Sequence, residues 1–438
     1  MRTVVSTDVV CLGESMVTFL PSQAGRLADV PSFERAIGGA ESNVACALAG
    51  SGHSVRWISR VGADGFGDHL LEAIAARGVD VGFAGRDPRR PTGIYFRTDG
   101  ERPTGLGPRD PLGTGARGET GAGADAGDGH GDGDGDGAAA AADDDAAVDA
   151  AGGSAGGAGA RTAEVVYYRA GSAASAMSPR TVDLAAVDDA SVLHITGITA
   201  ALSPECLELM RVLTGPRADR PLVSFDVNYR VGLWDRAVDA GHGPGILLEL
   251  ARGCDLVFVG EDEAEAAWGV TGGPYALRER LPEPGVLVVK QGATGATAFV
   301  RGTGSGTGSG GDPETGTDTG TDTGTDTGPD PETGRGDAHD RLRDEVHTVP
   351  ALRIDVAGSV GAGDGFAAGF ISATLRGLPV RERLRHGHLT AAAALTVPGD
   401  LAEPPSRELA DRLAALDDEA WGRLRLGPGW NTRKANAS

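Results

Sequence analysis

The chain has 438 residues, of which 70 are glycine and only 5% are aromatic, and its formal net charge is −22 at pH 7. This acidic balance argues against a nucleic-acid partner and against an anionic membrane surface, because both are bound through clustered basic residues. The four cysteines stand apart in apolar segments without metal-ligand spacing, and no segment approaches about 18 consecutive apolar residues, so we expect buried free thiols in a soluble cytoplasmic protein.

The N-terminal part of the chain alternates between strand and helix signals. Apolar runs typical of strands occur at residues 9–12, 16–20, 33–37, 54–61 and 91–97. Apolar residues fall at helical spacing after Glu41 and again after Gly67, which predicts two helices between these strands.

Two blocks of low complexity interrupt this pattern. Residues from about 100 to 161 are mostly Gly, Ala and Asp, and residues from about 302 to 340 contain a Thr-Gly-Thr-Asp repeat. Neither block has enough apolar side chains to offset the entropy lost on ordering, so we predict two disordered insertions at loop tips. Strand composition resumes at residues 164–169, and the simplest arrangement is a hairpin in which residues 94–97 pair with residues 165–168.

The remaining strands follow one another with helical patterns between them. Strand signals occur at residues 191–195, 222–225, 255–259 and 285–290, and two further strands are expected at residues 296–300 and 345–349. This alternation predicts a doubly wound, mostly parallel α/β sheet with helices on both faces. Polar residues follow directly after these strands, and ligands of such sheets bind at the carboxyl ends of the strands.

Small residues open the last strong helical pattern, in the order Gly361-Ala362-Gly363-Asp364. Backbone N–H groups and the helix dipole make a helix N-terminus a site for anions. A carboxylate there would repel a phosphate, but it suits a general base that takes a proton from an attacking hydroxyl while the N–H groups stabilise the transferred phosphoryl group. Taken alone, the motif is equally compatible with a glycine-rich turn in which Asp364 caps the helix.

Three stretches together resemble the ribokinase-like (PfkB) family of carbohydrate kinases, over nearly the whole chain except the two insertions. They are residues 38–45, residues 62–67 and residues 361–370. The resemblance implies one ribokinase-like kinase domain over residues 1–438, with a small β-sheet lid formed by residues of about 16–37 and 91–172. It also implies a base, Asp364, an anion hole of Gly361, Ala362 and Gly363, and a sugar-binding signature that includes Gly38, Gly39, Ala40 and Asn43.

A narrower similarity points to 2-keto-3-deoxygluconate kinases, and it rests on residues 91–95, 167–173, 197–203 and 226–230. In that subfamily two tyrosines and an arginine of the lid contact an acidic sugar, which implies substrate binding by Tyr95, Tyr167 and Arg169. Arg169 and Arg230 each offer the guanidinium fork that a sugar carboxylate needs. The favoured substrate is therefore 2-keto-3-deoxygluconate, phosphorylated on its terminal primary hydroxyl to give the 6-phosphate.

The same resemblance implies ATP and Mg²⁺ as cofactors. The nucleotide residues would be Asn228, Arg230, Lys290, Gly292, Gly295, Gly361 and Gly363, and Glu263 would organise the metal. Two positions depart from the family pattern. Gly260 stands where an Asn precedes the metal-organising Glu, which leaves the metal role of Glu263 open, and Gly358 replaces an Asp ahead of the anion hole, which leaves monovalent-cation binding open.

Each candidate residue also has a simpler structural interpretation. Asn43 would cap a helix, the two tyrosines would pack in a core, Arg230 would be a surface charge, Glu263 would stabilise a helix start, and residues 290–295 would form a hairpin turn. For the whole chain, the alternatives are a fructokinase or ribokinase, or a catalytically silent sugar-binding regulator. The expected partners are a sugar acid and ATP, with no nucleic acid and no membrane, and a homo-oligomer through the lid stays open.

Overall fold

The computed structural model describes residues 7–97, 165–217, 220–237, 243–302, 344–358 and 360–432. The two predicted insertions lie outside the described residues, with the exception of Gly302, and their disorder stays a prediction. Within the described ranges, no helix combines the length and the apolar composition that a membrane crossing requires. The four cysteines are buried free thiols, as predicted.

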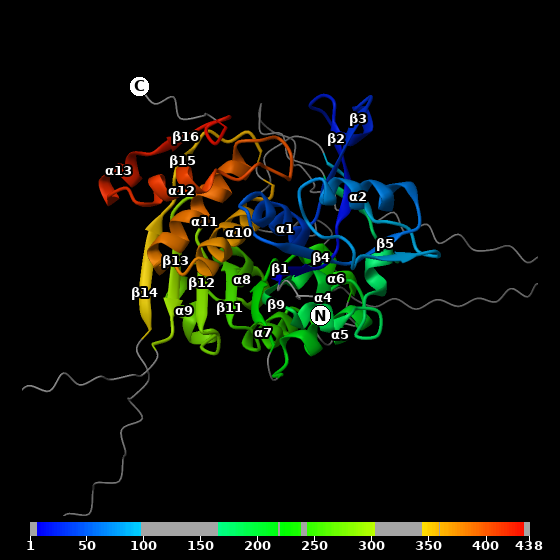
Figure 1. The fold of residues 1–438 in the computed structure, drawn as a ribbon, viewed down its shortest axis with the longest axis horizontal. Coiled ribbons are helices and arrows are strands. Elements are labelled where there is room, and N and C mark those ends of the chain that lie inside the picture. The colour runs from blue at the N-terminus through cyan, green and yellow to red at the C-terminus, as the bar shows by residue number, and fades with distance from the viewer. Residues whose placement is uncertain are drawn as a thin grey trace, which may run out of the picture.

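An eight-stranded sheet forms the centre of the molecule (Figure 1). In spatial order its strands are β14 (Glu345–Pro350), β13 (Gly295–Val300), β12 (Val286–Lys290), β11 (Leu256–Gly260), β10 (Leu222–Asp226), β9 (Ala190–Thr196), β1 (Thr7–Leu12) and β4 (Val55–Ile58). The six strands from β12 to β4 pair in parallel, and only β13 and β14 add antiparallel pairs at one edge. The predicted mostly parallel α/β fold is thus confirmed.

Helices cover both faces of this sheet because its strands are apolar on both sides. In β1, Val9 and Cys11 belong to one buried cluster while Val10 and Leu12 belong to the other. The first cluster is completed by α1 (Ala40–Gly50), α2 (Gly65–Ala75), α10 (Ala362–Leu375), α11 (Val380–Leu395), α12 (Arg407–Ala414) and α13 (Asp418–Arg423). The second is completed by α3 (Leu184–Asp188), α4 (Gly197–Ala200), α5 (Pro204–Thr214), α6 (Val231–Ala237), α7 (Gly245–Arg252), α8 (Glu261–Trp268) and α9 (Gly273–Arg280).

A separate four-stranded sheet, here called the small sheet, stands beyond the edge of the main layers (Figure 1). Its order is β3 (Phe33–Gly38), β2 (Met16–Pro21), β7 (Ile94–Arg97) and β8 (Val165–Tyr168). The strands β7 and β8 pair antiparallel with Ile94 opposite Tyr168, which confirms the predicted hairpin. Stacked rings of Phe19 and Phe96, with centroids 4.6 Å apart, join β2 to β7.

The single strand predicted at residues 54–61 is wrong in its extent. The strand β4 ends at Ile58, and β5 (Arg60–Gly62) pairs with β6 (Gly85–Asp87) in a sheet of two strands. The carbonyl oxygen of Ser59 accepts a hydrogen bond from the N–H of Gly85, so the chain changes pairing partner at this residue. The apolar pattern continues through both strands, so the sequence alone does not indicate where the chain changes its pairing partner.

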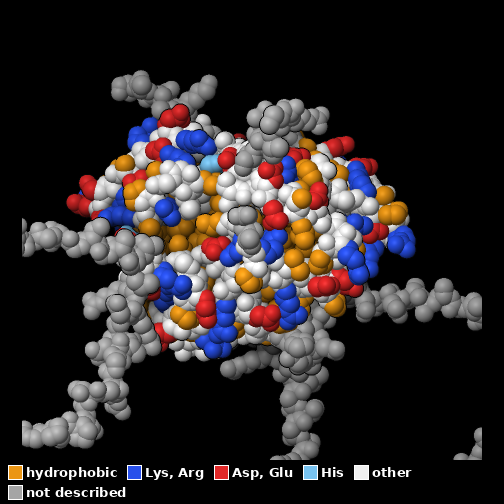
Figure 2. Space-filling model, turned by 60° about the horizontal axis from the view of Figure 1, so that its bottom comes forward, with side chains coloured by type: hydrophobic (Ala, Val, Ile, Leu, Met, Phe, Trp, Pro, Cys, Tyr) orange, Lys and Arg blue, Asp and Glu red, His pale blue; other side chains and the backbone are white. Residues whose placement is uncertain are grey.

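One face of the molecule mixes both signs of charge. On the face in Figure 2, basic and acidic side chains are interspersed, with hydrophobic side chains exposed between them. The remaining pair of strands, β15 (Arg353–Ile354) and β16 (Arg425–Leu426), joins the segment after β14 to the segment after α13 in parallel.

Candidate active site

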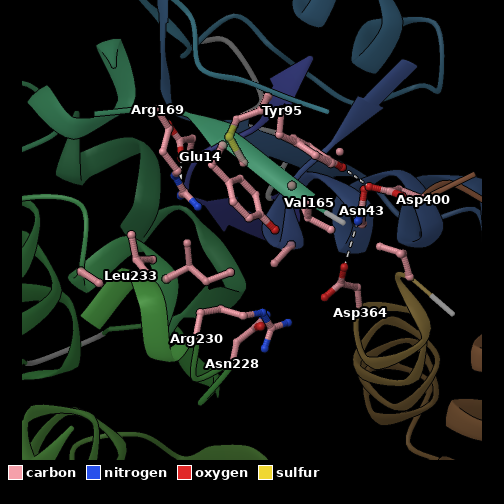
Figure 3. A pocket seen from close by; sticks show the side chains of 18 of the residues that line it. Glu14, Asn43, Tyr95, Val165, Arg169, Asn228, Arg230, Leu233, Asp364 and Asp400 are labelled. Atoms are coloured by element: carbon pink, nitrogen blue, oxygen red, sulfur yellow. Dashed lines mark hydrogen bonds and ion pairs between the residues drawn. The ribbon is translucent and has the colours of Figure 1, made fainter. Parts of the chain in front are cut away.

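A cavity of about 910 Å³ lies between the small sheet and the carboxyl ends of strands in the large sheet (Figure 3). The predicted site residues that line it are Gly38, Gly39, Ala40, Asn43, Tyr95, Tyr167, Arg169, Asn228, Arg230, Glu263, Lys290, Gly361, Ala362, Gly363 and Asp364. Gly292 and Gly295 do not line it; Gly292 lies in the turn between β12 and β13, Gly295 begins β13, and both take positive φ. The structure thus brings residues from both ends of the chain to one place.

Asp364 lies in the first turn of α10 and faces the cavity. Its Oδ2 accepts a hydrogen bond of 2.8 Å from the Nδ2 of Asn43 in α1 (Figure 3). Loss of surrounding water raises the pKa of this carboxyl group to about 6, and the nearby charge of Asp226 acts in the same direction. The hydrogen bond from Asn43 opposes this rise, since it stabilises the ionised form.

The N-terminus of α10 is shaped by Gly361, which has a φ of 78°. A β-carbon on Gly361 would lie 2.6 Å from the carbonyl oxygen of Asp400, so glycine is required for both conformation and space. The first N–H groups of a helix have no acceptor within the helix, and the N–H of Gly365 is the one that bonds back to Gly361. The N–H groups ahead of it are the ones that the predicted anion hole would use, and this role stays a prediction.

A lysine stands beside this helix N-terminus. The Nζ of Lys290 donates to both carboxylate oxygens of Asp226, at 2.8 and 3.0 Å, and lies 3.5 Å from the place of a β-carbon on Gly363. Burial would lower the pKa of Lys290, but the charges of Asp226 and Glu263 outweigh it and the pKa is raised. The ammonium group therefore stays positive next to the glycines.

Glu263 lies in the first turn of α8 and is held by two donors. Its Oε2 accepts from the N–H of Gly260 at 3.0 Å, and its Oε1 lies 3.3 Å from a guanidinium nitrogen of Arg230. Each carboxylate oxygen keeps a further lone pair for a metal or a metal-bound water. Among the described residues no three His, Cys, Asp or Glu side chains are grouped to hold a metal alone. Such a site fits Mg²⁺ that arrives with a nucleotide, since phosphates and water then supply most ligands.

Glu41, the acidic residue of the N-terminal signature, is fully buried and, unlike Ala40 and Asn43, does not line the cavity. Its Oε1 accepts from the hydroxyls of Thr196 and Thr199 at 2.8 and 2.9 Å. Burial raises the pKa of Glu41 to about 7. This carboxyl group fixes α1 to β9 and α4, and so fixes the position of Asn43.

Three residues at the end of the cavity next to the small sheet, where the sugar is expected and which is here called the sugar end, were not predicted from the sequence. Asp400 receives hydrogen bonds or ion pairs from the hydroxyl of Tyr95 and the guanidinium of Arg97, the latter at 2.7 Å. Glu14 forms an ion pair with Arg169 and accepts from the hydroxyl of Ser172 at 2.6 Å. A signal for Glu14 exists, because it follows the buried strand β1 at the edge where ligands bind. Arg97 only continues the alternation of β7, and Asp400 follows a Pro-Gly turn without a motif.

Comparison with known proteins gives a consistent result. The model of the pfkB family carbohydrate kinases matches residues 6–106, 155–310 and 339–407. The chain is 29% identical over 413 residues to a 2-dehydro-3-deoxygluconokinase of Bacillus subtilis, covering 93% of this chain and 96% of that protein. It is 28% identical over 412 residues to the enzyme of that name in Thermoproteus tenax, covering 93% and 95%. A probable chloroplastic fructokinase of Arabidopsis thaliana is 24% identical over 407 residues, covering 90% and 78%.

Solved structures share the fold. A PfkB protein from Polaromonas sp. JS666 superimposes with a TM-score of 0.61 at 27% identity, covering 94% of this chain and all of that one (100%). A protein from Escherichia coli described as a ribokinase II, solved in complex with ATP and Mg²⁺, gives a TM-score of 0.61 at 18% identity, covering 93% and 98%.

Proposed function

We propose, from the premise that this chain belongs to the pfkB family of carbohydrate kinases, that its sugar is 2-keto-3-deoxygluconate (2-dehydro-3-deoxygluconate). ATP is the phosphoryl donor, and the terminal primary hydroxyl of the sugar is the acceptor. The observation that carries the proposed phosphoryl transfer is the hydrogen bond between Asn43 of the sugar-binding signature and Asp364 at the glycine-rich N-terminus of α10, whereas the choice of sugar rests on Arg169 and on the names of two relatives. This hydrogen bond connects the proposed sugar site to the proposed anion site, because both sites meet at the carboxylate of Asp364.

The reaction follows from the groups around Asp364. The ionised carboxylate accepts the proton of the sugar hydroxyl as the oxygen attacks the γ-phosphorus of ATP. A new oxygen–phosphorus bond forms, and the bond between the γ-phosphorus and the bridging oxygen of ADP breaks. The N–H groups of Ala362 and Gly363 and the ammonium of Lys290 stabilise the negative charge of the group in transfer.

The nucleotide lies against the residues at the ends of β10 and β12. Asn228, Arg230 and Lys290 line that part of the cavity, and Gly292 and Gly295 lie in the adjoining turn and at the start of β13. Mg²⁺, when bound, neutralises charge on the ATP phosphates, and Glu263 would hold it through its carboxylate. Arg230, which is paired with Glu263, is positioned to contact phosphate oxygens from the same side.

The sugar lies under the small sheet, which acts as a lid. Tyr95 and Tyr167 pack with ring centroids 5.4 Å apart, and the guanidinium of Arg169 lies 5.8 Å from the ring of Tyr167. Arg169 offers charge-assisted hydrogen bonds to a sugar carboxylate. The naming of the two relatives with 29% and 28% identity supports this substrate.

A fructokinase is the second candidate. Its support is the fructokinase relative with 24% identity, together with the pairing of Arg97 and Arg169 with carboxylates at the sugar end, which leaves no surplus positive charge on these two side chains. A neutral sugar such as fructose would suit this site, because the positive charges of Arg97 and Arg169 are already balanced by carboxylates.

Steady-state assays of ADP release with 2-keto-3-deoxygluconate, fructose and ribose separate the candidates. We expect the highest kcat/KM with the keto acid. A preference for fructose or ribose overturns the substrate but not the kinase activity. If no sugar releases ADP while calorimetry still detects sugar binding, the chain is a silent sugar-binding regulator.

A further inference from the structure

We infer that Glu14 is a positioning residue for substrate recognition, which holds the guanidinium of Arg169 at the sugar end of the cavity. The inference rests on the proposed function, since it concerns the binding of a sugar acid. Glu14 follows β1 and precedes β2, at the root of the small sheet, and only 2% of its surface is exposed. It lines the same cavity as Arg169 (Figure 3).

The carboxylate of Glu14 joins the segments that enter and leave the small sheet. One oxygen pairs with Arg169, directly after β8, and the other accepts from the hydroxyl of Ser172 at 2.6 Å. On a third side it is enclosed by Gly93, where a β-carbon would lie 3.2 Å from Oε1. Glu14 therefore has little freedom to turn, and its direction sets that of Arg169.

Arg169 keeps donors for a ligand after this pairing. The arginine side chain lines the cavity and is 13% exposed, so part of its guanidinium is open to a ligand, whereas its Nε is buried and has no hydrogen-bond partner in the described part of the chain. A guanidinium group has five N–H donors in a fixed plane, so it can bind Glu14 at one edge and a second carboxylate at another. Glu14 also cancels the charge of Arg169 before a substrate arrives, so its contribution lies in orientation and not in net attraction.

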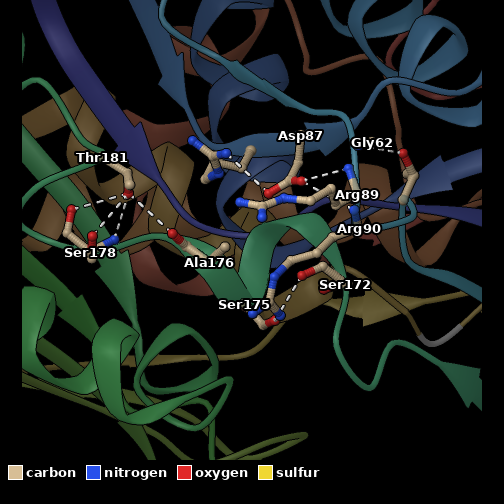
Figure 4. A network of polar contacts seen from close by, with 11 residues as sticks. Gly62, Asp87, Arg89, Arg90, Ser172, Ser175, Ala176, Ser178 and Thr181 are labelled. Carbon is tan, nitrogen blue, oxygen red and sulfur yellow. Dashed lines mark hydrogen bonds and ion pairs between the residues drawn. The ribbon is translucent and has the colours of Figure 1, made fainter.

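Other contacts hold the segment before β7 and the segment after β8, here called the stems of the small sheet, without touching Arg169. Asp87 accepts from the guanidinium of Arg60 at 3.0 Å and from the N–H groups of Arg89 and Arg90 (Figure 4). The guanidinium of Arg90 donates to Ser175 at 3.1 Å. Asp87 thus provides a control, because its loss loosens a stem while the pair of Glu14 and Arg169 remains.

A double-mutant cycle tests the inference with 2-keto-3-deoxygluconate and fructose as substrates. Glu14→Ala and Arg169→Ala should each raise KM for the keto acid about tenfold, and the double variant should not exceed the larger single effect, because both remove the same contact. The kcat at saturation and the KM for fructose should change much less. Glu14→Gln should restore most of the affinity, since its amide oxygen still accepts from Arg169 while its amide nitrogen can donate to Ser172.

Further variants keep the inference open to contradiction. If Glu14→Ala does not fold, Ser172→Ala serves instead, and its rise in KM should vanish in the Arg169→Ala background. The control Asp87→Asn should shift KM for both sugars together. Additive effects of Glu14 and Arg169, or equal effects on both sugars, overturn the inference. A wild-type preference for fructose, which is seen without any variant, contradicts the proposed substrate and removes the sugar carboxylate on which the inference depends, so it overturns both.

Discussion

Asp364 is the residue on which the proposed chemistry depends most directly. Asp364→Asn should lower kcat by about two to four orders of magnitude, because an amide cannot accept the proton of the sugar hydroxyl. KM should change little, since the shape of the side chain is kept. Steady-state kinetics with matched thermal unfolding curves measure both. If the turnover of Asp364→Asn is close to that of the wild type, the assignment of Asp364 as the base is wrong.

The pKa of Asp364 predicts the pH dependence of the same step. The base works in its ionised form, so kcat/KM should fall as the pH drops below about 6, the pKa to which enclosure raises this carboxyl group. Asn43 stabilises the ionised form, so Asn43→Ala should move this acidic limb to higher pH.

Ser42→Ala is the matched control for that shift. Ser42 is the neighbour of Asn43 in α1, but its hydroxyl bonds to Ser15 at 2.9 Å and to the carbonyl of Gly39. Its pH profile should coincide with that of the wild type. An acidic limb that stays in place in Asn43→Ala would mean that another group titrates.

Single residues differ in how far the sequence could predict them. Asp364 and Asn43 stand in motifs with their own chemistry, and both line the cavity as expected. Asp400 could not be found this way, because its partners Tyr95 and Arg97 lie about three hundred positions earlier in the chain. The prediction of Arg169 named a guanidinium for the substrate but not the carboxylate that holds it, since an ion pair between distant segments leaves no local pattern.

Among the elements, α10 depends on the conformation of its first residue. Gly361→Ala should lower kcat by up to about a hundredfold, because the β-carbon would collide with Asp400 and displace N–H groups that must lie within an ångström of their place. Gly377, at the other end of α10, has a φ of 70° with nothing within 4 Å of an added β-carbon. Gly377→Ala should therefore cost a similar backbone strain, roughly 1–2 kcal/mol, without loss of turnover.

Thermal unfolding and kcat measured on both variants test this expectation. Equal loss of turnover in the two would assign the effect to general destabilisation of α10. Full turnover in Gly361→Ala would remove the N-terminus of α10 from the proposed anion hole.

Elements as such were predictable where a pattern is local. The helix after Gly361 has apolar residues at helical spacing, and the strands β9 to β12 are short apolar runs with clear ends. The order of the strands in the sheet was not predictable from the sequence, because it depends on pairings between distant segments. The strand β1 lies between β4 and β9, and Val9 pairs with both Val55 and Val192. The division of residues 54–61 at Ser59 was missed for the same reason, because it follows from the choice of partner strand.

At the scale of the molecule, both insertions depart from and return to paired strand ends. Arg97 lies opposite Val165, and Val300 lies opposite Glu345. Replacing residues 107–160 and 303–337 with short turns should preserve folding and most activity, because a doubling of loop length costs only about 0.6 kcal/mol. Thermal unfolding and kcat/KM of the shortened chains measure this. Slow hydrogen exchange throughout either block in the full chain would refute the predicted disorder.

The contact between Asn43 and Asp364 has a consequence for the folding of the chain during its synthesis. These residues are 321 positions apart, so nearly the whole chain must leave the ribosome before they can meet. Contacts between residues so far apart in sequence form slowly, because the entropy of loop closure is lost before the contact contributes any favourable free energy. Compact intermediates with a collapsed core and native helices arise earlier in proteins of this size. Catalytic competence therefore comes late in folding, because a nascent chain that still lacks Asp364 has no proposed base for phosphoryl transfer.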